Sequence, residues 1–361
     1  MPTIFYSVMG EGRGHAARAR AMVERLRDRH RVVLFSSADG YEFLESVFGN
    51  DPEIDLHAVP GLVFHYTEGK LDQAKTIREG AAFWLNANRS AQDLLPLFRS
   101  ELPALAICDF EPLLPRAARR AGVPLVSLDH QHFMSTYDLT SLPARLQRWA
   151  WRMSWATWAF GINAQTTVVS AFYQPPLRRG YEHVVQVSTL LRDAVRHRTP
   201  TFEGPLLSYL RRATPPRVIE TLAALPRPVR IYGLGERPPQ GAATFHAIDE
   251  TTFVDDLASC EALISAAGNQ LLGEALHLGK PILALPERNH HEQCINACFL
   301  EQLGGGEWSH IESVTSAAIN GFLERIPAHR ERIQTDARSY DGLPKAVEAV
   351  EQALANATRR S

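Results

Sequence analysis

The sequence feature that most constrains the fold lies between residues 262 and 298, where two short apolar runs each lead directly into a helix-forming segment. Residues 262–265 and 281–285 are typical of buried strands because they are short and almost uniformly apolar. We expect the helix after the first strand to have Asn269 as its cap and to end at Gly279. Two successive strand-to-helix units predict a parallel sheet, and open α/β sheets bind ligands at the carboxyl ends of their strands.

The start of this helix also predicts an anion site. The first N–H groups of a helix have no partner within it, and the helix dipole is positive at that end. Gly268 would allow a diphosphate to approach the backbone because glycine has no side chain. The second unit adds the polar side chains of Glu292, Gln293 and Asn296 at the same edge of the sheet.

The order of residues in this stretch resembles the donor-binding region of GT-B glycosyltransferases, in particular the bacterial family 28-like and UDP-glucuronosyltransferase-like enzymes. That family's order is a glycine, a glutamate, Gly-x-Pro, a proline, Glu-Gln and Asn-Ala. In this chain the corresponding residues are Gly268, Glu274, Gly279-Lys280-Pro281, Pro286, Glu292-Gln293 and Asn296-Ala297.

The resemblance implies a donor-binding role for these positions. Gly268, Asn269 and Gln270 would face the nucleotide diphosphate, and Asn296 would belong to the same pocket. Glu274 would face the ribose hydroxyls, since a carboxylate can accept two hydrogen bonds from a vicinal diol. Glu292 and Gln293 would face the hydroxyls of the donor sugar. Gly233 follows another predicted strand and is expected to line the nucleotide pocket. Each residue alone also fits an ordinary helix or turn position, and only the ordered set favours a donor site.

A glycine-rich turn follows the first predicted strand, residues 3–8. It contains Gly12 and Gly14 and leads through His15 into a predicted helix over residues 16–29, which suggests a phosphate or acceptor loop. The spacing does not meet the dinucleotide-binding fingerprint. An imidazole at this position suits proton transfer, although a lone histidine is more often structural. In the resembled plant and animal UDP-glycosyltransferases, the histidine after this turn is the general base.

Two later strands end in candidate partners or rivals for His15. Asp109 closes the predicted strand 104–108, on the side where the His15 loop should emerge, so it could orient the imidazole. Enzymes of the resembled group use such a His–Asp pair. The next strand ends at Asp129, and His130 and His132 after it are alternative bases. Which of the two would face the site depends on how far the strand geometry continues.

Residues 142–160 form an unusual predicted helix. Its apolar stripe consists of Leu142, Leu146, Trp149, Met153, Ala156 and Phe160. Beside the stripe are Arg145, Arg148 and Arg152, and around it Trp151, Trp155 and Trp158. Indoles and arginines together are typical of a helix at an anionic membrane surface. A buried helix that packs its tryptophans between domains is the alternative, and the sequence leaves both open.

The alternation of strands and helices along the chain, together with the resemblance, predicts an α/β protein of GT-B fold, with two doubly wound Rossmann-like domains facing across a cleft. Residues 1–190 would form the acceptor-side domain and residues 200–340 the nucleotide-sugar donor domain. Residues 193–204 contain Thr-Pro and end at Gly-Pro, which indicates a linker. The resemblance implies that a helix in residues 341–361 crosses back to the first domain.

Composition limits partners and compartment. A net charge of −2 over 361 residues argues against a nucleic-acid binder. No apolar run reaches the roughly 18 residues of a membrane span, and no basic leader is evident. Four scattered cysteines fit a reduced compartment. We therefore expect a cytoplasmic protein that could attach peripherally to the inner face of the membrane.

These features predict an inverting glycosyltransferase of hexosyl or N-acetylhexosaminyl type. The donor would be a nucleotide-diphospho sugar, UDP-linked by resemblance, and the acceptor a lipid, a small molecule or a glycan. His15 would be the base, and the helix at Asn269 would hold the leaving diphosphate. The sequence has no Asp-x-Asp motif, so neither a metal nor a resident cofactor is expected. A sugar-nucleotide epimerase or hydrolase, and a non-catalytic sugar-nucleotide sensor, are the alternatives, since fold does not fix the reaction.

Overall fold

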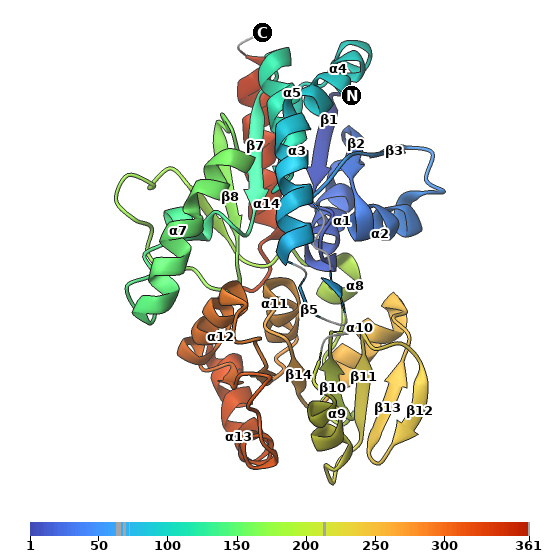
Figure 1. The fold of residues 1–361 in the computed structure, drawn as a ribbon, viewed down its shortest axis with the longest axis vertical. Coiled ribbons are helices and arrows are strands. Elements are labelled where there is room, and N and C mark those ends of the chain that lie inside the picture. Colours follow the sequence, from blue (N-terminus) through green and yellow to red (C-terminus); the bar gives the residue numbers. More distant parts are fainter. Residues whose placement is uncertain (63–65, 68–69, 72, 212–213, 360–361) are drawn as a thin grey trace. The chain divides into compact units, whose positions relative to one another are not determined.

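The chain divides into two compact units in a computed structural model that describes residues 1–62, 66–67, 70–71, 73–211 and 214–359 (Figure 1). Unit 1 comprises Met1–Ser141, Gln147–Arg192 and Gly342–Ser361. Unit 2 comprises Leu142–Leu146 and Asp193–Asp341. Family resemblance and alternation predicted two Rossmann-like α/β domains, and each unit has this architecture.

Unit 1 is built on a seven-stranded sheet in the order β3-β2-β1-β6-β7-β8-β9, and every pairing in it is parallel. Its strands are β1 Thr3–Val8, β2 Arg31–Ser36, β3 Ile54–Ala58, β6 Leu105–Asp109, β7 Leu125–Asp129, β8 Thr166–Ser170 and β9 Val185–Val187. Its helices are α1 Arg13–Leu26, α2 Ala38–Phe48, α3 Gln73–Asp93, α4 Leu95–Glu101, α5 Leu113–Ala121, α6 Phe133–Thr136, α14 Leu343–Thr358 and α7 Ala144–Phe160, of which residues 144–146 belong to unit 2. The short strands β4 Tyr66–Thr67 and β5 Lys70–Leu71 pair separately as an antiparallel ribbon.

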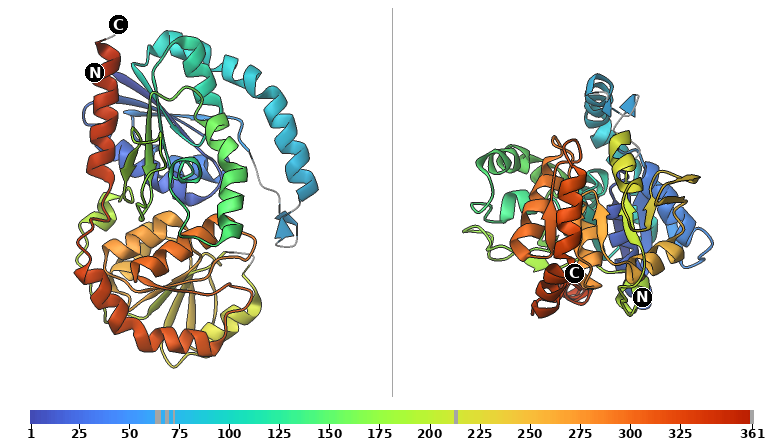
Figure 2. Two further views of the ribbon diagram at one scale, coloured as in Figure 1. Left: turned by 90° about the vertical axis from the view of Figure 1, so that its left-hand side faces the viewer. Right: turned by 90° about the horizontal axis from the view of Figure 1, so that it is seen from below.

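Two apolar cores cover the two faces of this sheet, because successive strand residues point to opposite sides. Ile4 and Tyr6 of β1 pack in one core with α1, α2 and α14. Phe5 packs in the other core, together with residues of α3, α4 and α5. The last helix, α14, buries Leu343 and Val350 against the first face and so completes unit 1, as the red helix beside its strands in Figures 1 and 2 shows.

The sheet of unit 1 has its topological switch point between β1 and β6. The chain runs from β1 outward through β2 and β3, and then returns to the other side of β1 with β6. Val8 at the end of β1 pairs with Asp109 at the end of β6. Ligands of open α/β sheets bind at the carboxyl ends of the strands at such a point.

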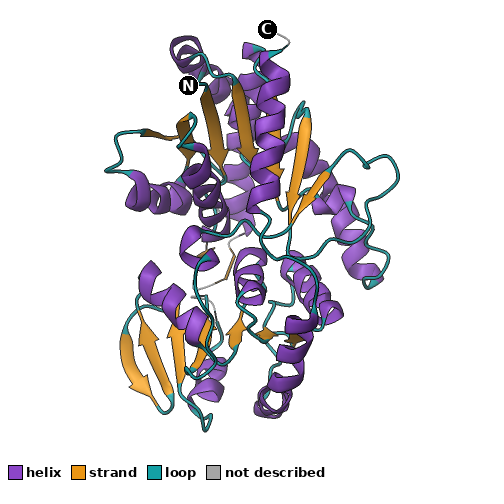
Figure 3. Cartoon of the chain, turned by 180° about the vertical axis from the view of Figure 1, so that it is seen from behind, coloured by secondary structure: helices purple, strands orange, loops and turns teal. Residues whose placement is uncertain are grey.

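Unit 2 also has a seven-stranded sheet, in the order β12-β13-β11-β10-β14-β15-β16. Figure 3 draws the strands in orange and the helices in purple. The strands of unit 2 are β10 Leu206–Tyr209, β11 Val229–Tyr232, β12 Arg237–Gln240, β13 Ala243–His246, β14 Leu263–Ser265, β15 Ile282–Ala284 and β16 Gly306–Trp308. Its helices are α8 Asp193–Arg196, α9 Pro216–Ala223, α10 Glu250–Ser259, α11 Asn269–His277, α12 His291–Leu303 and α13 Ser316–Thr335. The switch point lies between β10 and β14, directly before α11.

The structure differs from the sequence-based prediction mainly at edges and helix ends. The edge strands β9, β12 and β16 were not predicted. The two prolines of β12 are typical of a loop in sequence, but this strand pairs antiparallel with β13 at the edge of the sheet. Helix α1 begins at Arg13, not at residue 16, so His15 lies in its first turn. Helix α13 continues through Pro327 to Thr335, although a proline inside a helix usually ends or kinks it.

Candidate active site

His15 and Asp109 meet at the switch point of unit 1. Nδ1 of His15 lies 2.8 Å from Oδ1 of Asp109. The side chain of Asp109 is fully buried, whereas 13% of the His15 side chain is exposed. One residue comes from the first turn of α1 and the other from the end of β6, and the parallel pairing of β1 with β6 brings them together. The structure therefore forms the predicted His–Asp contact.

The loop before His15 leaves the start of α1 open. Gly12 precedes the helix with φ of 83°, a left-handed conformation that favours glycine, and it makes no side-chain cap to the helix. Gly14 is exposed in the first helical turn. The first N–H groups of α1 therefore lack the usual side-chain cap, which suits a polar ligand at this end.

Arg18 is a third member of this site that the sequence analysis missed. It is 97% buried, its Nε donates to Oδ2 of Asp109 at 2.7 Å, and an Nη donates to Oδ1 at 2.8 Å. Burial alone would lower the pKa of the guanidinium, but the Asp109 carboxylate more than offsets this and raises it. The sequence signal that could have revealed Arg18 was its position three residues after His15, which places both side chains on one face of α1.

The same guanidinium constrains the protonation of His15. An Nη of Arg18 lies 2.8 Å from Nδ1 of His15, close to the Asp109 carboxylate. If Nδ1 carries the proton, it donates to Asp109 and Nε2 is left as a base. If Arg18 donates to Nδ1, the proton resides on Nε2 and the ring cannot accept another proton there. The chemistry of this site depends on which tautomer the three groups select.

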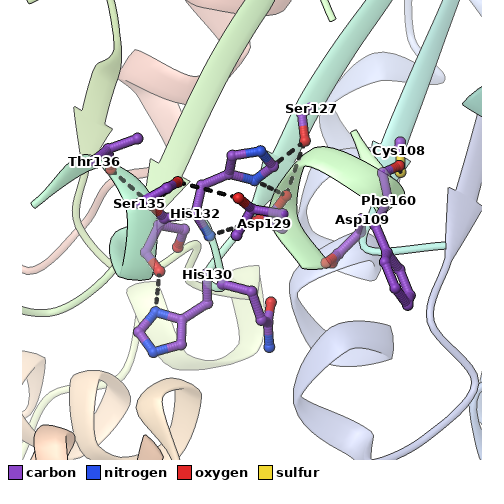
Figure 4. A network of polar contacts seen from close by, with 12 residues as sticks. Cys108, Asp109, Ser127, Asp129, His130, His132, Ser135, Thr136 and Phe160 are labelled. Carbon is purple, nitrogen blue, oxygen red and sulfur yellow. Dashed lines mark hydrogen bonds and ion pairs between the residues drawn. The ribbon is translucent and has the colours of Figure 1, made fainter. Parts of the chain in front are cut away.

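The alternative histidines have different surroundings (Figure 4). His130 is 1% exposed, and its Nδ1 lies 3.0 Å from the backbone oxygen of Ser170. His132 has its Nδ1 at 2.7 Å from Oδ2 of Asp129. From the same loop, Gln131 approaches His15, with its Nε2 at 3.4 Å from Nε2 of His15. Of the three histidines, His15 is the one that lies at the switch point between β1 and β6.

In unit 2, the start of α11 lies at the switch point between β10 and β14. Gly268, not Asn269, is the residue that precedes the helix, so the prediction that Asn269 is the cap is wrong. Gly268 has an extended backbone with φ of −76°, and a methyl group added there would meet no atom within 4 Å. The space in front of the first helical N–H groups is therefore open to a ligand.

Several predicted donor residues bond within unit 2. Nε2 of Gln270 donates to Oε1 of Glu274 at 3.0 Å, and Glu274 is 2% exposed. The Asn296 amide donates to the backbone oxygen of Ala267 at 2.9 Å, which ties α12 to the loop before α11. Gln293 accepts from the backbone N–H of Glu287 at 3.1 Å. These contacts shape the loops at the strand ends, whatever ligand binds there.

The other two donor predictions have distinct environments. Glu292 is half-buried in the first turn of α12. Gly233 has φ of 90°, and a methyl group there would lie 2.1 Å from the backbone oxygen of Leu210. The packing of β10 against the turn after β11 therefore requires glycine at position 233, independently of any nucleotide.

Arg211 was also missed by the sequence analysis. It follows β10 at the switch point and lines a small pocket with Ala266 and Leu285, the residues that follow β14 and β15. Its guanidinium pairs with Glu287 at 3.3 Å. The Arg211 cation lies at the same strand ends that precede α11. The sequence signal that could have revealed this residue was the location of β10 beside the switch point.

Within the described residues, no group of three histidine, cysteine, aspartate or glutamate side chains is arranged to hold a metal ion. None of the helices in those same ranges combines the length and the apolar character needed to cross a membrane.

Comparison with solved structures identifies the architecture. LpCGTa, solved in complex with UDP, superposes with a TM-score of 0.67 at 17% identity, covering 99% of this chain and 99% of that chain. VinC, solved in complex with dTDP, superposes with a TM-score of 0.63 at 17% identity, covering 99% of this chain and 100% of that chain. With two Rossmann-like units in one chain, these likenesses define a two-domain α/β protein of the GT-B fold.

Sequence comparison then gives the family. Residues 2–327 match glycosyl transferase family 1, and the chain belongs to that family of enzymes. An uncharacterized glycosyltransferase of Methanosarcina mazei is 33% identical over 144 residues, which span 36% of this chain and 38% of that relative. The match thus spans well under half the length of this curated relative.

Proposed function

We propose that the chain is an inverting glycosyltransferase that moves a sugar from a nucleotide-diphospho sugar to an acceptor hydroxyl. The observation that carries this proposal is the 2.8 Å contact between His15 and the buried Asp109 at the switch point of unit 1. A partly exposed imidazole held by a carboxylate is suited to remove a proton from a hydroxyl. Membership of glycosyl transferase family 1 supports the reaction class.

In the proposed reaction, Nε2 of His15 takes the proton of the acceptor hydroxyl. The acceptor oxygen forms a bond to the anomeric carbon, and the bond from that carbon to the diphosphate breaks on the opposite face, which inverts the configuration. Asp109 accepts from Nδ1–H and so keeps Nε2 unprotonated. Because Arg18 already compensates the charge of Asp109, we expect this carboxylate to orient the ring more than to stabilise the imidazolium.

The donor would bind at the carboxyl edge of unit 2. The N–H groups at the start of α11 would hold the diphosphate, and Arg211 would add a positive charge at the same edge. Glu274 would bind the ribose, and Glu292 and Gln293 the sugar. We propose UDP as the nucleotide because residues 268–297 resemble the order in UDP-sugar enzymes, and the solved complex of LpCGTa with UDP supports this.

The proposed reaction uses neither a metal nor a resident cofactor. The nucleotide sugar is a co-substrate, and the start of α11 supplies the positive electrostatics for the leaving diphosphate. Adding a chelator to the assay tests the metal independence, since the rate of UDP release should not change.

His15→Ala is expected to lower kcat by about 10² to 10⁴ while the affinity for UDP stays nearly unchanged, because the base is lost but the donor contacts in unit 2 remain. Turnover is measured as UDP release from UDP-sugars with a panel of hydroxyl acceptors, and UDP affinity by calorimetry. His197→Ala serves as the control, since this histidine is 72% exposed and belongs to neither of the two His–Asp contacts.

Normal turnover by His15→Ala, together with an inactive His130→Ala or His132→Ala, would show that another histidine is the base. Loss of UDP binding along with turnover in His15→Ala would assign His15 to a diphosphate contact. Asp109→Asn is a poor test of the His–Asp contact, because it leaves the buried Arg18 cation without its carboxylate, and breaking such a pair costs about 3 to 5 kcal/mol.

Glu274→Ala is expected to weaken UDP binding by about 1 to 3 kcal/mol, because a charged acceptor for two ribose hydroxyls is removed. Calorimetry with UDP measures the change, and thermal unfolding confirms that the variant is folded. Glu331→Ala provides a matched control, since this glutamate is exposed on α13. Unchanged UDP affinity in a folded Glu274→Ala protein would remove the ribose assignment and leave the Gln270 contact as its role.

The exposed face of α7 supports a membrane-associated lipid acceptor. Trp151, Trp155 and Trp158 are 70%, 57% and 74% exposed, so a helix that buries its tryptophans does not describe these three. Arg148 and Arg152 are exposed beside them. We therefore propose that this face meets an anionic membrane surface on the cytoplasmic side, with indoles at headgroup depth and arginines near phosphates.

Replacing Arg148 and Arg152 with glutamine should weaken binding to anionic liposomes by about 1 kcal/mol for each arginine. Arg145 is left in place because it donates to the backbone oxygen of Arg288 at 2.7 Å within unit 2. Co-sedimentation measures the change. Equal binding of the wild type and the double variant would exclude this face as the membrane contact.

The same incubation with UDP-sugars separates the alternative functions. Slow release of UDP that accelerates with an acceptor fits the transferase. Conversion of the sugar while it is still on the nucleotide would indicate an epimerase. UDP release that no acceptor accelerates would indicate a hydrolase, and binding without turnover would indicate a sensor.

A further inference from the structure

A cavity of about 700 Å³ lies in unit 1 beside α7, and none of the groups assigned to catalysis lines it. Its wall on one side is α7, and on the other the segment 181–184 that precedes β9. The side chains that matter for its chemistry are Trp151, Trp155, Trp158, Asn163, Tyr181 and His183. Every residue that lines it belongs to unit 1.

Three indoles form an aromatic wall on this cavity. Trp151, Trp155 and Trp158 are spaced four and three residues apart, so they lie on one face of α7, the green helix in Figure 2. All three remain more than half exposed. Tryptophan normally buries most of its large apolar surface, so three exposed indoles around a cavity indicate a surface that a ligand covers.

The remainder of the lining is rich in hydrogen-bonding groups. Hydroxyl or amide side chains line it at Ser135, Thr136, Ser154, Thr157, Asn163 and Thr167. Arg152 also lines it, and no acidic residue occurs among the described residues that do. Four of these hydroxyls, those of Ser135, Thr136, Ser154 and Thr157, donate to backbone oxygens, so what they offer a ligand is an acceptor oxygen. An acyl chain could not donate to these oxygens. A saccharide ring fits better, because its C–H face can pack on an indole while its hydroxyls bond to the polar groups.

His132 lies in the lining and has a fixed ring orientation. Its Nδ1 is held at 2.7 Å by Oδ2 of Asp129, which also accepts from the Ser127 hydroxyl at 2.9 Å (Figure 4). Burial would raise the pKa of Asp129, but the charge and hydrogen bonds of His132 more than offset this and lower it to about 2. The carboxylate therefore stays ionised and fixes the imidazole at neutral pH.

Gly161 keeps the other edge of this imidazole clear. A methyl group at Gly161 would approach Cε1 and Nε2 of His132 to 3.0 and 3.2 Å. Both residues line the cavity. A residue with a side chain at position 161 would thus crowd the edge of the ring that does not face Asp129.

The cavity extends away from the proposed catalytic edge. Thr167 is the second residue of β8, and Val184 directly precedes β9, so this part of the lining is at the amino ends of parallel strands. His15 and Asp109 lie at the carboxyl ends of β1 and β6. A ligand in the cavity would therefore bind beside the reacting groups and not between them.

We propose that this cavity is a saccharide-binding site, with a sugar ring stacked on the indoles of Trp155 and Trp158 and its hydroxyls bonded to the polar lining. That the bound sugar belongs to the acceptor rests on the proposed glycosyltransferase function. The ring can come from a free glycan or from the headgroup of a glycolipid, and the chemistry of recognition is the same in both.

The test uses the full chain and two kinds of probe. Mono- and disaccharides of glucose, galactose, mannose and N-acetylglucosamine are titrated by calorimetry. Co-sedimentation uses zwitterionic phosphatidylcholine vesicles with or without glycosyl diacylglycerols of the same sugars, so that the proposed attraction to anionic lipid does not contribute. The variants are the double substitution Trp155→Ala/Trp158→Ala and, as control, Leu85→Ala, which removes an 85% exposed apolar side chain of unit 1 outside the cavity.

We expect the wild type and Leu85→Ala to bind at least one saccharide or its glycolipid, and the double variant to lose about tenfold or more in affinity, which is about 1.4 kcal/mol. UDP affinity should be the same in all three proteins. Binding of soluble sugars indicates a free glycan, and binding only of glycolipid vesicles indicates a headgroup.

The proposal is overturned if the wild type binds none of the sugars in either form, or if the double variant binds them as the wild type does. Equal sedimentation with vesicles that carry and lack the sugar would assign the indoles to the membrane alone. Failure of UDP-sugar turnover in the wild type, with saccharide binding intact, would count against the proposed transferase and leave the saccharide site standing.

Discussion

The buried ion pair between Arg18 and Asp109 is the interaction on which the proposed active site depends. Two hydrogen bonds of 2.7 and 2.8 Å join the guanidinium to a carboxylate that has no exposed surface. Two ions can be buried in this way only when each satisfies the other, since removing one partner leaves an uncompensated charge. The pair also links α1 to β6 across the switch point, and so fixes the helix turn that carries His15.

This arrangement changes how the His–Asp contact should be understood. A carboxylate without a cation would both orient an adjacent imidazole and favour its protonation. Here the positive charge of Arg18 compensates the negative charge of Asp109. The main effect that Asp109 can have on His15 is therefore to orient its ring. The resemblance to UDP-glycosyltransferases implied the pair of His15 and Asp109 but not Arg18. The sequence alone does not distinguish a buried arginine on a helix from the many arginines of this chain that are exposed to solvent.

Much of the fold followed from the sequence because the inner strands are short, apolar and each followed by a helix. The strand at residues 3–8 was predicted at its observed bounds, and the strand predicted at 104–108 is observed one residue later, at Leu105–Asp109. The edge strands could not be predicted, since β9 and β16 have three residues each and β12 carries Pro238 and Pro239. Hydrophobic periodicity can be recognised only in segments longer than these strands. An edge strand also needs fewer apolar residues, because it is hydrogen-bonded to a neighbouring strand on one side only.

The candidate site was predictable where it depends on backbone topology, and less so where it depends on side-chain contacts. Topology places His15, Asp109 and the start of α11 at carboxyl strand ends, which the strand-to-helix pattern already indicated. It does not show that Gln270 bonds to Glu274, that packing requires Gly233, or that the indoles of α7 line a cavity. The measurement that tests the central claim most directly is ¹⁵N NMR of the His15 imidazole at neutral pH. The account predicts a neutral ring with the proton on Nδ1, bonded to Asp109, and an unprotonated Nε2; a proton on Nε2, with Nδ1 accepting from Arg18, would contradict it.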